Sequence, residues 1–311
     1  MADPRLRAIV IGYGRVGRPL AQALEQADIK VVAVGEHPDS PNVARAVEDG
    51  FLTLPVEHLE EDADFLFLTV PDRNIEVVAL QLAESISLSR GKRSGEAERI
   101  QEGDVPPTVV HLSGGMGLKA LNPLREAGFL RLAMHPMQTF PPEASADRFR
   151  GIHAGITADP DAVEVAELLC ERLGMTPLQI PEERRSEYHL ASVLASNFMP
   201  LMLELGAQKL ESITGDRYQS LAALWPLMAG MTESLRTNLP EQAMTGPVAR
   251  NDRETVRRHL ESLPDDEANL YRTLSAALVK MAGTSDLLDD EQADEWLAFL
   301  RPENKSSGAG K

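Results

Sequence analysis

The stretch Arg7-Ala8-Ile9-Val10-Ile11-Gly12-Tyr13-Gly14-Arg15-Val16-Gly17 joins an apolar strand to a Gly-x-Gly-x-x-Gly motif, and a helical pattern follows at once. In this strand-to-helix context the motif predicts a turn that binds the pyrophosphate of a dinucleotide. The first glycine permits the tight turn, the second admits the pyrophosphate to the backbone, and the third lets the helix pack on the strand. The helix start offers unpaired N–H groups to the phosphates.

The second strand supports this interpretation. Residues 30–35 form an apolar run that ends at Glu36, nineteen residues after Gly17. An acidic side chain at that position accepts hydrogen bonds from an adenosine ribose. Because a carboxylate would repel a 2′-phosphate, Glu36 favours NAD over NADP. The choice stays open, since three arginines are near in sequence, namely Arg15, Arg18 and Arg45.

Composition limits the class of protein. The chain has 311 residues, enough for about two domains. Its 31 basic and 48 acidic residues give a net charge of −17, which argues against nucleic-acid binding. The single Cys170 excludes an internal disulfide and fits a reducing compartment. The longest apolar run, residues 190–203, is shorter than the roughly 20 residues of a membrane span. We therefore expect a cytoplasmic protein that does not enter a membrane.

Strand and helix signals alternate through the first half, which is typical of a parallel sheet covered on both faces. The expected strands are 7–12, 30–35, 51–54, 63–70, 108–112, 130–134, 151–157 and 175–180. The expected helices are 15–26, 74–85 and 161–173. Residues 86–107 lack periodicity and are rich in Ser, Gly, Arg and Glu, which predicts a surface loop. The fold class is α/β, a doubly wound and mostly parallel Rossmann sheet.

Past Pro181-Glu182 the chain turns helical, so we place a Rossmann domain at 1–182 and an all-helical domain at 183–301. Residues 302–311 are expected to be a disordered tail. The longest helix, 186–213, should kink at Pro200. The further expected helices are 221–239, 252–262, 267–282 and 291–299. The apolar surface of the long helix predicts a homodimer through the helical domain.

In an open parallel sheet the ligand crevice lies beyond the carboxyl ends of the strands. Three polar segments end strands there: Val70-Pro71-Asp72, His111-Leu112-Ser113-Gly114-Gly115 and Met134-His135-Pro136-Met137-Gln138-Thr139-Phe140. Gly114 admits the nicotinamide ribose to the backbone, or else it serves only a tight turn. His135 is the candidate for proton transfer, because a neutral imidazole can exchange the proton that accompanies hydride movement. The alternative for His135 is a hydrogen bond at the domain junction.

Two further groups of polar residues lie in the helical part. His189 and Ser196 are seven residues apart and share one face of an apolar helix, with Asn197 beside them. They orient a substrate, or they hydrogen-bond other helices or a second subunit. The turn from Thr245 to Asp252 holds Arg250, which suits a substrate carboxylate or an ion pair with Asp252. No His, Cys or Asp cluster has metal-ligand spacing, so we expect no metal.

Four motifs in order carry a family resemblance: His111-Leu112-Ser113-Gly114, His135-Pro136-Met137-Gln138-Thr139-Phe140, Ala195-Ser196-Asn197-Phe198 and Thr245-Gly246-Pro247-Val248-Ala249-Arg250. Over residues 7–263 the chain resembles a bacterial family of Rossmann-like proteins with a C-terminal domain of unknown function. Members are often labelled NADP oxidoreductases of the deazaflavin-coenzyme-dependent type. The resemblance implies a helical second domain similar to that of 6-phosphogluconate dehydrogenase relatives, and it implies no substrate.

More distant relatives differ in their expected proton donors. His135-Pro136 resembles the His-Pro motif of prephenate dehydrogenases, which carries a catalytic histidine, although they place small residues where this chain has Gln138-Thr139-Phe140. Hydroxyacid dehydrogenases pair a lysine and an asparagine one helical turn apart, whereas Asn197 here follows Val193. That proton-donor scheme therefore does not transfer.

Together these observations predict an NAD(P)-dependent oxidoreductase acting on a small polar substrate. The alternative is a regulatory or sensor protein that binds NAD(P) without turnover. The candidate catalytic residues are His135, Asn197, Ser113 and His189. The candidate cofactor-binding residues are Gly12, Tyr13, Gly14, Arg15, Val16, Gly17, Glu36, Val70, Pro71 and Gly114, and the candidate substrate-binding residues are Gln138, Thr139, Ser196, Thr245 and Arg250.

Overall fold

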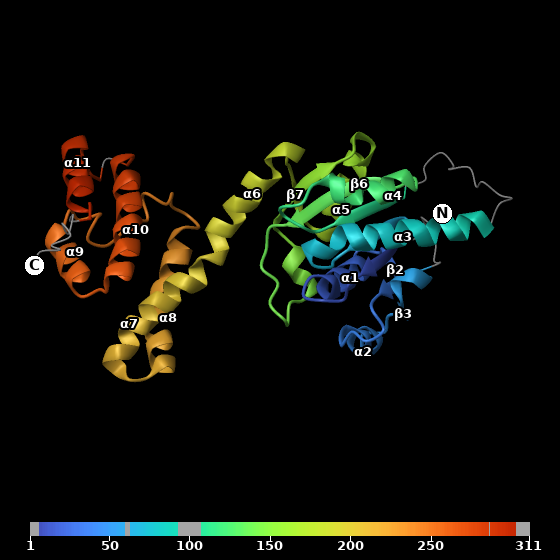
Figure 1. Ribbon diagram of the computed structural model, residues 1–311, viewed down its shortest axis with the longest axis horizontal. Coiled ribbons are helices and arrows are strands. Elements are labelled where there is room, and N and C mark those ends of the chain that lie inside the picture. The colour runs from blue at the N-terminus through green and yellow to red at the C-terminus, as the bar shows by residue number, and fades with distance from the viewer. Residues whose placement is uncertain (1–5, 60–62, 93–106, 286, 303–311) are drawn as a thin grey trace, which may run out of the picture. The chain divides into compact units, whose positions relative to one another are not determined.

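The computed structural model describes residues 6–59, 63–92, 107–285 and 287–302, and the chain divides into two compact units after Phe198. In the first unit the described residues form one eight-stranded sheet, with helices on both of its faces (Figure 1). The strands are β1 (Arg7–Ile11), β2 (Lys30–Gly35), β3 (Thr53–Leu54), β4 (Phe65–Leu68), β5 (Thr108–His111), β6 (Leu130–Pro136), β7 (His153–Ala158) and β8 (Thr176–Gln179).

The strand order is β3-β2-β1-β4-β5-β6-β7-β8, and neighbouring strands are parallel except for the antiparallel pair β6–β7. β4 and β5 are buried along their whole length, as strands covered on both faces must be. The order reverses between β1 and β4, which opens a crevice at the carboxyl edge of the sheet. The predicted doubly wound, mostly parallel α/β sheet is confirmed.

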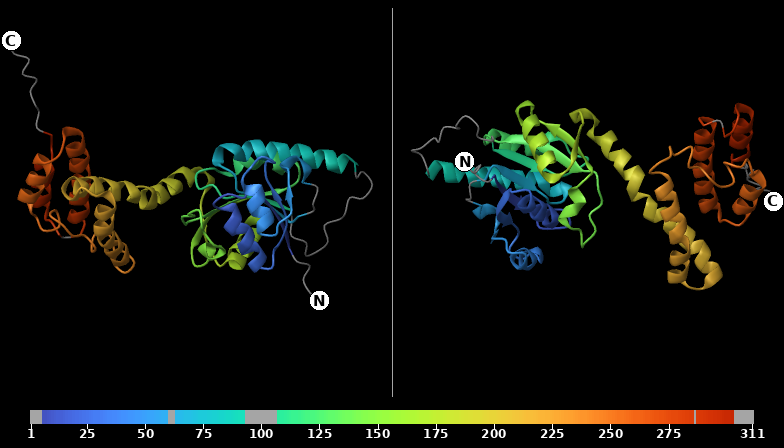
Figure 2. Two further views of the ribbon diagram at one scale, coloured as in Figure 1. Left: turned by 90° about the horizontal axis from the view of Figure 1, so that it is seen from below. Right: turned by 180° about the vertical axis from the view of Figure 1, so that it is seen from behind.

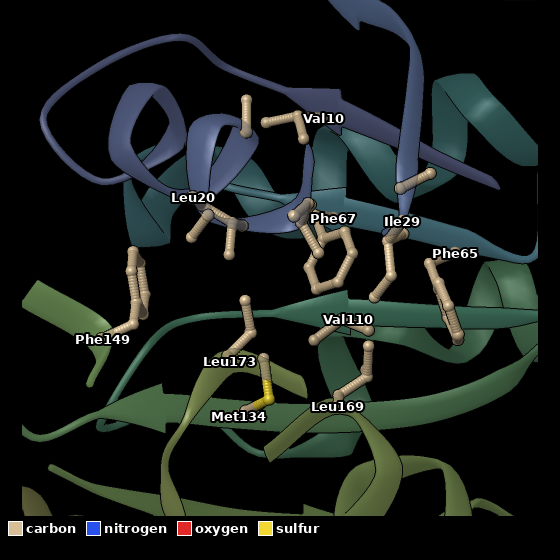
Figure 3. Packing of buried hydrophobic residues seen from close by; sticks show 14 of the residues in the cluster. Val10, Leu20, Ile29, Phe65, Phe67, Val110, Met134, Phe149, Leu169 and Leu173 are labelled. Carbon is tan, nitrogen blue, oxygen red and sulfur yellow. The ribbon is translucent and has the colours of Figure 1, made fainter. Parts of the chain in front are cut away.

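The helices of the first unit form a layer on each face of the sheet. They are α1 (Gly17–Gln26), α2 (Asn42–Glu48), α3 (Asp72–Lys92), α4 (Asn122–Glu126), α5 (Val163–Leu173) and α6 (Arg185–Ser192). Leu20 of α1 and Leu169 of α5 pack with Phe67 of the sheet in one core (Figure 3). Ile75 of α3 and Leu124 of α4 belong to the core on the other face, which places α3 opposite α1 (Figure 2).

Helices α2, α3 and α4 differ from the sequence prediction, which did not include the short α4. The predicted helix 74–85 extends as α3 to Lys92, so the first part of the predicted 86–107 loop is helical. Ile86 still packs against the core, and backbone hydrogen bonds propagate a helix beyond the last strongly apolar position. The remainder of that loop, 93–106, and the tail residues 303–311 lie outside the described residues. Helix α2 was not predicted, because its seven residues bury only Ala46 and leave almost no apolar period.

The boundary between the units falls after Phe198 rather than at Pro181-Glu182. The reason is α6, which belongs to the first unit because Arg185 is buried against it and hydrogen-bonds Ser113 and Thr157. The long helical run contains a π-helical turn at Val193–Asn197, before the position at which a kink was expected. Pro200 itself lies in the first turn of the next helix, where a missing N–H costs nothing.

The described part of the second unit is helical, as predicted. Its helices are α7 (Met199–Thr214), α8 (Arg217–Ser234), α9 (Arg253–Glu261), α10 (Asp265–Gly283) and α11 (Asp290–Phe299). Val256, Val279 and Trp296 form its core together with Leu288 and Leu300. Asp252 caps α9 by accepting a hydrogen bond from the Thr255 backbone N–H.

The helical run Glu182–Thr214 is long and apolar enough, by length and composition alone, to cross a membrane. Its most apolar window has a mean hydropathy of 1.4 and is 6% buried. The apolar run read from the sequence, residues 190–203, is shorter than this helical run. A single helix of this kind is weak evidence for a membrane span, since an apolar helix that another protein surface covers has the same composition.

Candidate functional site

The glycine-rich loop after β1 is compact on the inside and open on the outside. Gly12 has a φ of 95°, a conformation that favours glycine, and its N–H donates to the Gly35 carbonyl at 2.9 Å. A side chain at Gly17 would collide with the Gly12 carbonyl oxygen and would lie 2.5 Å from Oγ1 of Thr69. A side chain at Gly14 would meet no atom within 4 Å. Gly12 therefore permits the turn, Gly17 permits the close contact between helix and loop, and Gly14 leaves the backbone accessible.

Glu36 lies against this loop. Its Oε1 accepts hydrogen bonds from the Tyr13 backbone N–H at 2.5 Å and from Nδ2 of Asn42 at 3.1 Å. The fully buried Tyr13 ring points inward, and its hydroxyl donates to Asp49 at 2.8 Å. Asp49 also accepts from Nε of Arg18 at 2.7 Å, a hydrogen bond that holds the pKa of Asp49 below its usual range. Arg18 is thus committed to a carboxylate.

The other predicted cofactor-binding residues lie at the same edge of the sheet. Arg15 is exposed and Val16 precedes the first residue of α1, while Val70 and Pro71 connect β4 to α3. The start of α1 next to the open backbone at Gly14 matches what a pyrophosphate needs. The residues present therefore fit a dinucleotide.

The loop after β5 is fixed by its own polar groups. Oγ of Ser113 donates to Oδ2 of Asp72 at 2.7 Å and accepts from the Met116 N–H at 3.1 Å. Nδ1 of His111 accepts a hydrogen bond from the Ser113 N–H at 3.2 Å. The other ring nitrogen, Nε2, therefore carries the proton and donates it to the Gly117 carbonyl at 3.1 Å. Burial lowers the pKa of His111 to about 4. His111 is a neutral structural residue, and Ser113 contacts Asp72 rather than His135.

Two imidazoles meet over Gly114. A side chain at Gly114 would lie 2.5 Å from Nδ1 of His189 and 3.0 Å from Cε1 of His135. The two rings are edge to face with centroids 6.0 Å apart. Nδ1 of His189 is buried and has no hydrogen-bond partner among the described residues. The structure thus brings together three predicted residues from β6, α6 and the loop after β5.

Two residues at this place were missed by the sequence analysis. The Tyr188 hydroxyl lies 2.7 Å from Nδ1 of His135, and Arg185 donates to the Ser113 carbonyl at 2.6 Å and to Oγ1 of Thr157 at 2.9 Å. Tyr188 and His189 come three and four residues after Arg185, so both lie on the face of α6 that carries Arg185. That spacing was readable in the sequence once His189 had been chosen.

Burial, with a smaller effect of nearby charges, keeps the His135 ring neutral. Burial is the main cause that lowers the pKa of His135 to about 4, and the Arg185 and His189 side chains add to it. Asp72 acts in the opposite direction. The ring is therefore neutral at pH 7, because burial places its pKa below the ordinary value of about 6.5.

The remaining predicted residues of the first unit have local partners. Oγ of Ser196 donates to the Ser192 carbonyl at 2.9 Å, and its oxygen lies 2.8 Å from Oδ1 of Asn197, which is exposed. Gln138 and Thr139 are exposed after β6 and bond to each other at 2.8 Å. No hydrogen bond joins these four residues to His135 in the described part of the chain.

Thr245 and Arg250 belong to the second unit, and both are exposed. Their turn has a structural use: Asn251 adopts a φ of 54°, and its Oδ1 accepts from Nε1 of Trp296 at 2.8 Å. Arg250 acts on Asp252 through charge, lowering the pKa of that carboxyl after the larger effects of the Thr255 hydrogen bonds. Among the described residues, no group of three or more His, Cys, Asp or Glu side chains is placed to hold a metal ion.

Comparison with known proteins identifies both parts of the chain. Residues 1–136 match the model of the Rossmann-like domain. Residues 152–278 match the model of the Domain of unknown function DUF2520. The chain carries these two domains in sequence, which confirms the resemblance inferred from its four motifs.

Solved structures share the fold over most of the chain. A proposed NADP oxidoreductase from Bacteroides fragilis is 23% identical, with 88% of this chain and 97% of that chain covered and a TM-score of 0.68. A protein from Thermotoga maritima is 24% identical, with 90% and 99% covered and a TM-score of 0.65. Pyrroline carboxylate reductase from Plasmodium falciparum, solved with NADP bound, is 11% identical, with 95% and 98% covered and a TM-score of 0.55. At these identities the similarity shows the fold.

Proposed function

We propose that this protein is a nicotinamide-dependent oxidoreductase that transfers a hydride between NAD(P) and a small polar substrate. The observation that carries the proposal is the meeting of His135 and His189 over Gly114. This meeting lies at the carboxyl edge of the sheet, where ligands of open α/β sheets bind. The glycine-rich loop at the same edge fits a dinucleotide, and the oxidoreductase names of several proteins with this fold agree with the proposal.

The chain's own residues have distinct parts in this proposal. The backbone at Gly14 and the start of α1 would hold the pyrophosphate, and Glu36 would hold the adenosine ribose. The nicotinamide, when bound, supplies or accepts the hydride. His135 exchanges the proton with the substrate, and His189 offers its unpartnered Nδ1 to a substrate polar group.

We infer a preference for NAD over NADP. The Glu36 carboxylate is fixed beside the loop by hydrogen bonds from the Tyr13 backbone N–H and the Asn42 side chain. A 2′-phosphate would therefore meet the Glu36 carboxylate, and the guanidinium of Arg18, which is near in sequence, is already engaged by Asp49. Titration of NADH and NADPH by fluorescence measures the preference, and equal affinities would refute the argument from Glu36.

The proposed function is tested by cofactor binding followed by a turnover screen across 2-hydroxy acids, imines and deazaflavin. His135→Gln should retain cofactor binding and lower turnover by about 10²–10⁴-fold, the usual contribution of acid–base catalysis. His153→Gln is the matched control, because His153 is exposed at the start of β7. Tight cofactor binding without turnover across the panel would instead favour a regulatory or sensor protein, and His135→Gln with full turnover would make His135 structural.

We also propose a homodimer through the helical unit. Ile213 at the end of α7 is 81% exposed, and Trp225 and Leu227 in α8 are 61% and 70% exposed. Exposed apolar side chains of this kind mark interaction surfaces. A second copy covering them would also account for the apolar composition of α7. Sedimentation equilibrium should give twice the chain mass, and Trp225→Glu should shift the protein toward monomer. A monomeric wild type at micromolar concentration would refute the dimer.

A further inference from the structure

The Tyr188 side chain lies against two residues of the sheet. Its ring meets the His135 ring edge to face at 5.6 Å and an interplanar angle of 85°. Its hydroxyl lies directly over Gly155 of β7, where any side chain would collide with it. Gly155 is the residue that pairs with His135 across the antiparallel strands. A small residue at this register position therefore lets a tyrosine from α6 reach the imidazole.

The hydrogen bond between Tyr188 and His135 has a preferred direction. The Gly155 backbone acts on the Tyr188 oxygen as a hydrogen-bond donor, which occupies an acceptor site of that oxygen. Burial raises the pKa of Tyr188, so the hydroxyl keeps its proton, and in the relay proposed below it donates that proton to Nδ1 of His135 at 2.7 Å. The neutral imidazole then carries its own proton on Nε2, the atom that lies next to Gly114.

Arg185 lies on the other side of the tyrosine. Its side chain is 1% exposed, and its Cζ is 5.8 Å from the centre of the Tyr188 ring, within cation–π range. Both hydrogen-bond acceptors it contacts are uncharged, the Ser113 carbonyl and the Thr157 hydroxyl, and its Nε has no partner among the described residues. A buried cation without a hydrogen-bonded carboxylate is costly, and it favours negative charge on a neighbour. Tyr188 is the neighbour whose charge it most strongly feels.

We propose that Arg185, Tyr188 and His135 form a proton relay, in which the Tyr188 hydroxyl proton moves to Nδ1 of His135 as the Nε2 proton moves to an oxygen of a carbonyl substrate. This inference rests on the proposed hydride transfer. It assigns the substrate class as a carbonyl compound, or the matching alcohol in reverse. Tyr188 acts through His135 and is a positioning residue.

The relay balances atoms and electrons. The hydride forms a new C–H bond, the carbonyl π pair moves to oxygen, and that oxygen takes the Nε2 proton. Nδ1 takes the proton of Tyr188, which becomes a phenolate beside Arg185. That proton then returns from Nδ1 to Tyr188 while Nε2 takes a proton from water, which restores the starting tautomer. The nicotinamide is oxidised and the carbonyl is reduced. An alkoxide is a stronger base than a phenolate, so the net proton movement is favourable, and the imidazole is neutral before and after.

The experiment measures imidazole tautomers by ¹⁵N NMR in histidine-labelled full-length protein, with His135 assigned by its absence in His135→Gln. The wild type should show His135 as the neutral Nε2–H tautomer at pH 7. Tyr188→Phe keeps the ring but removes the donor, and it should give a mixture of both tautomers. Tyr218→Phe is the control, since Tyr218 is 84% exposed in the second unit, and it should leave the His135 signals unchanged.

The outcomes separate the relay from the proposed function. An Nδ1–H tautomer in the wild type, or an unchanged tautomer in Tyr188→Phe, overturns the relay while leaving NADH binding intact. Failure of the wild type to bind NADH or NADPH overturns the proposed function and the relay with it. With any carbonyl substrate that turns over, Tyr188→Phe should lower kcat at least tenfold at nearly constant KM. An unchanged kcat also overturns the relay.

Discussion

Replacing one glycine of the loop should weaken cofactor binding without destabilising the fold. An alanine methyl at Gly14 meets no atom within 4 Å, and its φ is not positive. Such a substitution stabilises by about 0.4–1 kcal/mol through the unfolded chain, which raises Tm by about 1–4 °C for a unit of this size. The same methyl occupies the space where the pyrophosphate approaches the backbone. We expect Gly14→Ala to weaken NADH binding at least tenfold, about 1.4 kcal/mol.

Gly17→Ala provides the contrasting variant. Its methyl would collide with the Gly12 carbonyl and lie 2.5 Å from Oγ1 of Thr69, so the helix must move. Overpacking of this kind costs about 1–3 kcal/mol and should lower Tm. Thermal unfolding by circular dichroism and NADH fluorescence titration measure the two effects separately. The reasoning is refuted if Gly14→Ala lowers Tm as far as Gly17→Ala does, or if it binds NADH like the wild type.

Three further predictions concern stability. Asp159→Ala removes the carboxylate that pairs with Arg131, whose side chain is only 11% exposed. The free energy of unfolding in urea should fall by about 3–5 kcal/mol, because a buried cation loses its ion-pair partner. Asp147→Ala, which breaks an exposed ion pair, should change it by less than about 0.5 kcal/mol. Burial opposes ionisation of Asp159, but hydrogen bonds from Arg131 lower its pKa. Its stabilising effect is therefore complete above the unfolded pKa of about 3.9 and is lost as pH falls through the folded value, so acid unfolding of Asp159→Asn should depend less on pH than that of the wild type. Asn251→Ala and Asn251→Gly both lose the hydrogen bond from Trp296. Alanine disfavours the positive φ of this position and glycine does not, so Asn251→Ala should lower Tm further. Equal Tm values would contradict this.

The local pattern of apolar and polar residues was sufficient to predict the Rossmann sheet of the first unit. An apolar run before Gly12 and an acidic residue after the second run predicted a Rossmann sheet, because parallel strands buried on both faces have few polar positions. Strand ends then predicted which side chains would share one edge, and the structure brings Ser113, Gly114 and His135 to that edge. Helix ends were less predictable. α3 extends beyond its apolar period, since backbone hydrogen bonds do not require buried side chains.

Residue types and their spacing establish that this chain has a dinucleotide fold, a helical second part and a histidine at a strand end. They do not establish what that histidine touches. Tyr188 reaches His135 over 53 positions of sequence only because β7 returns antiparallel to β6 and places Gly155 beside the imidazole. Arg185 is buried rather than solvated because α6 packs on the same loop. Such contacts depend on sheet order and long-range packing, which local periodicity does not encode.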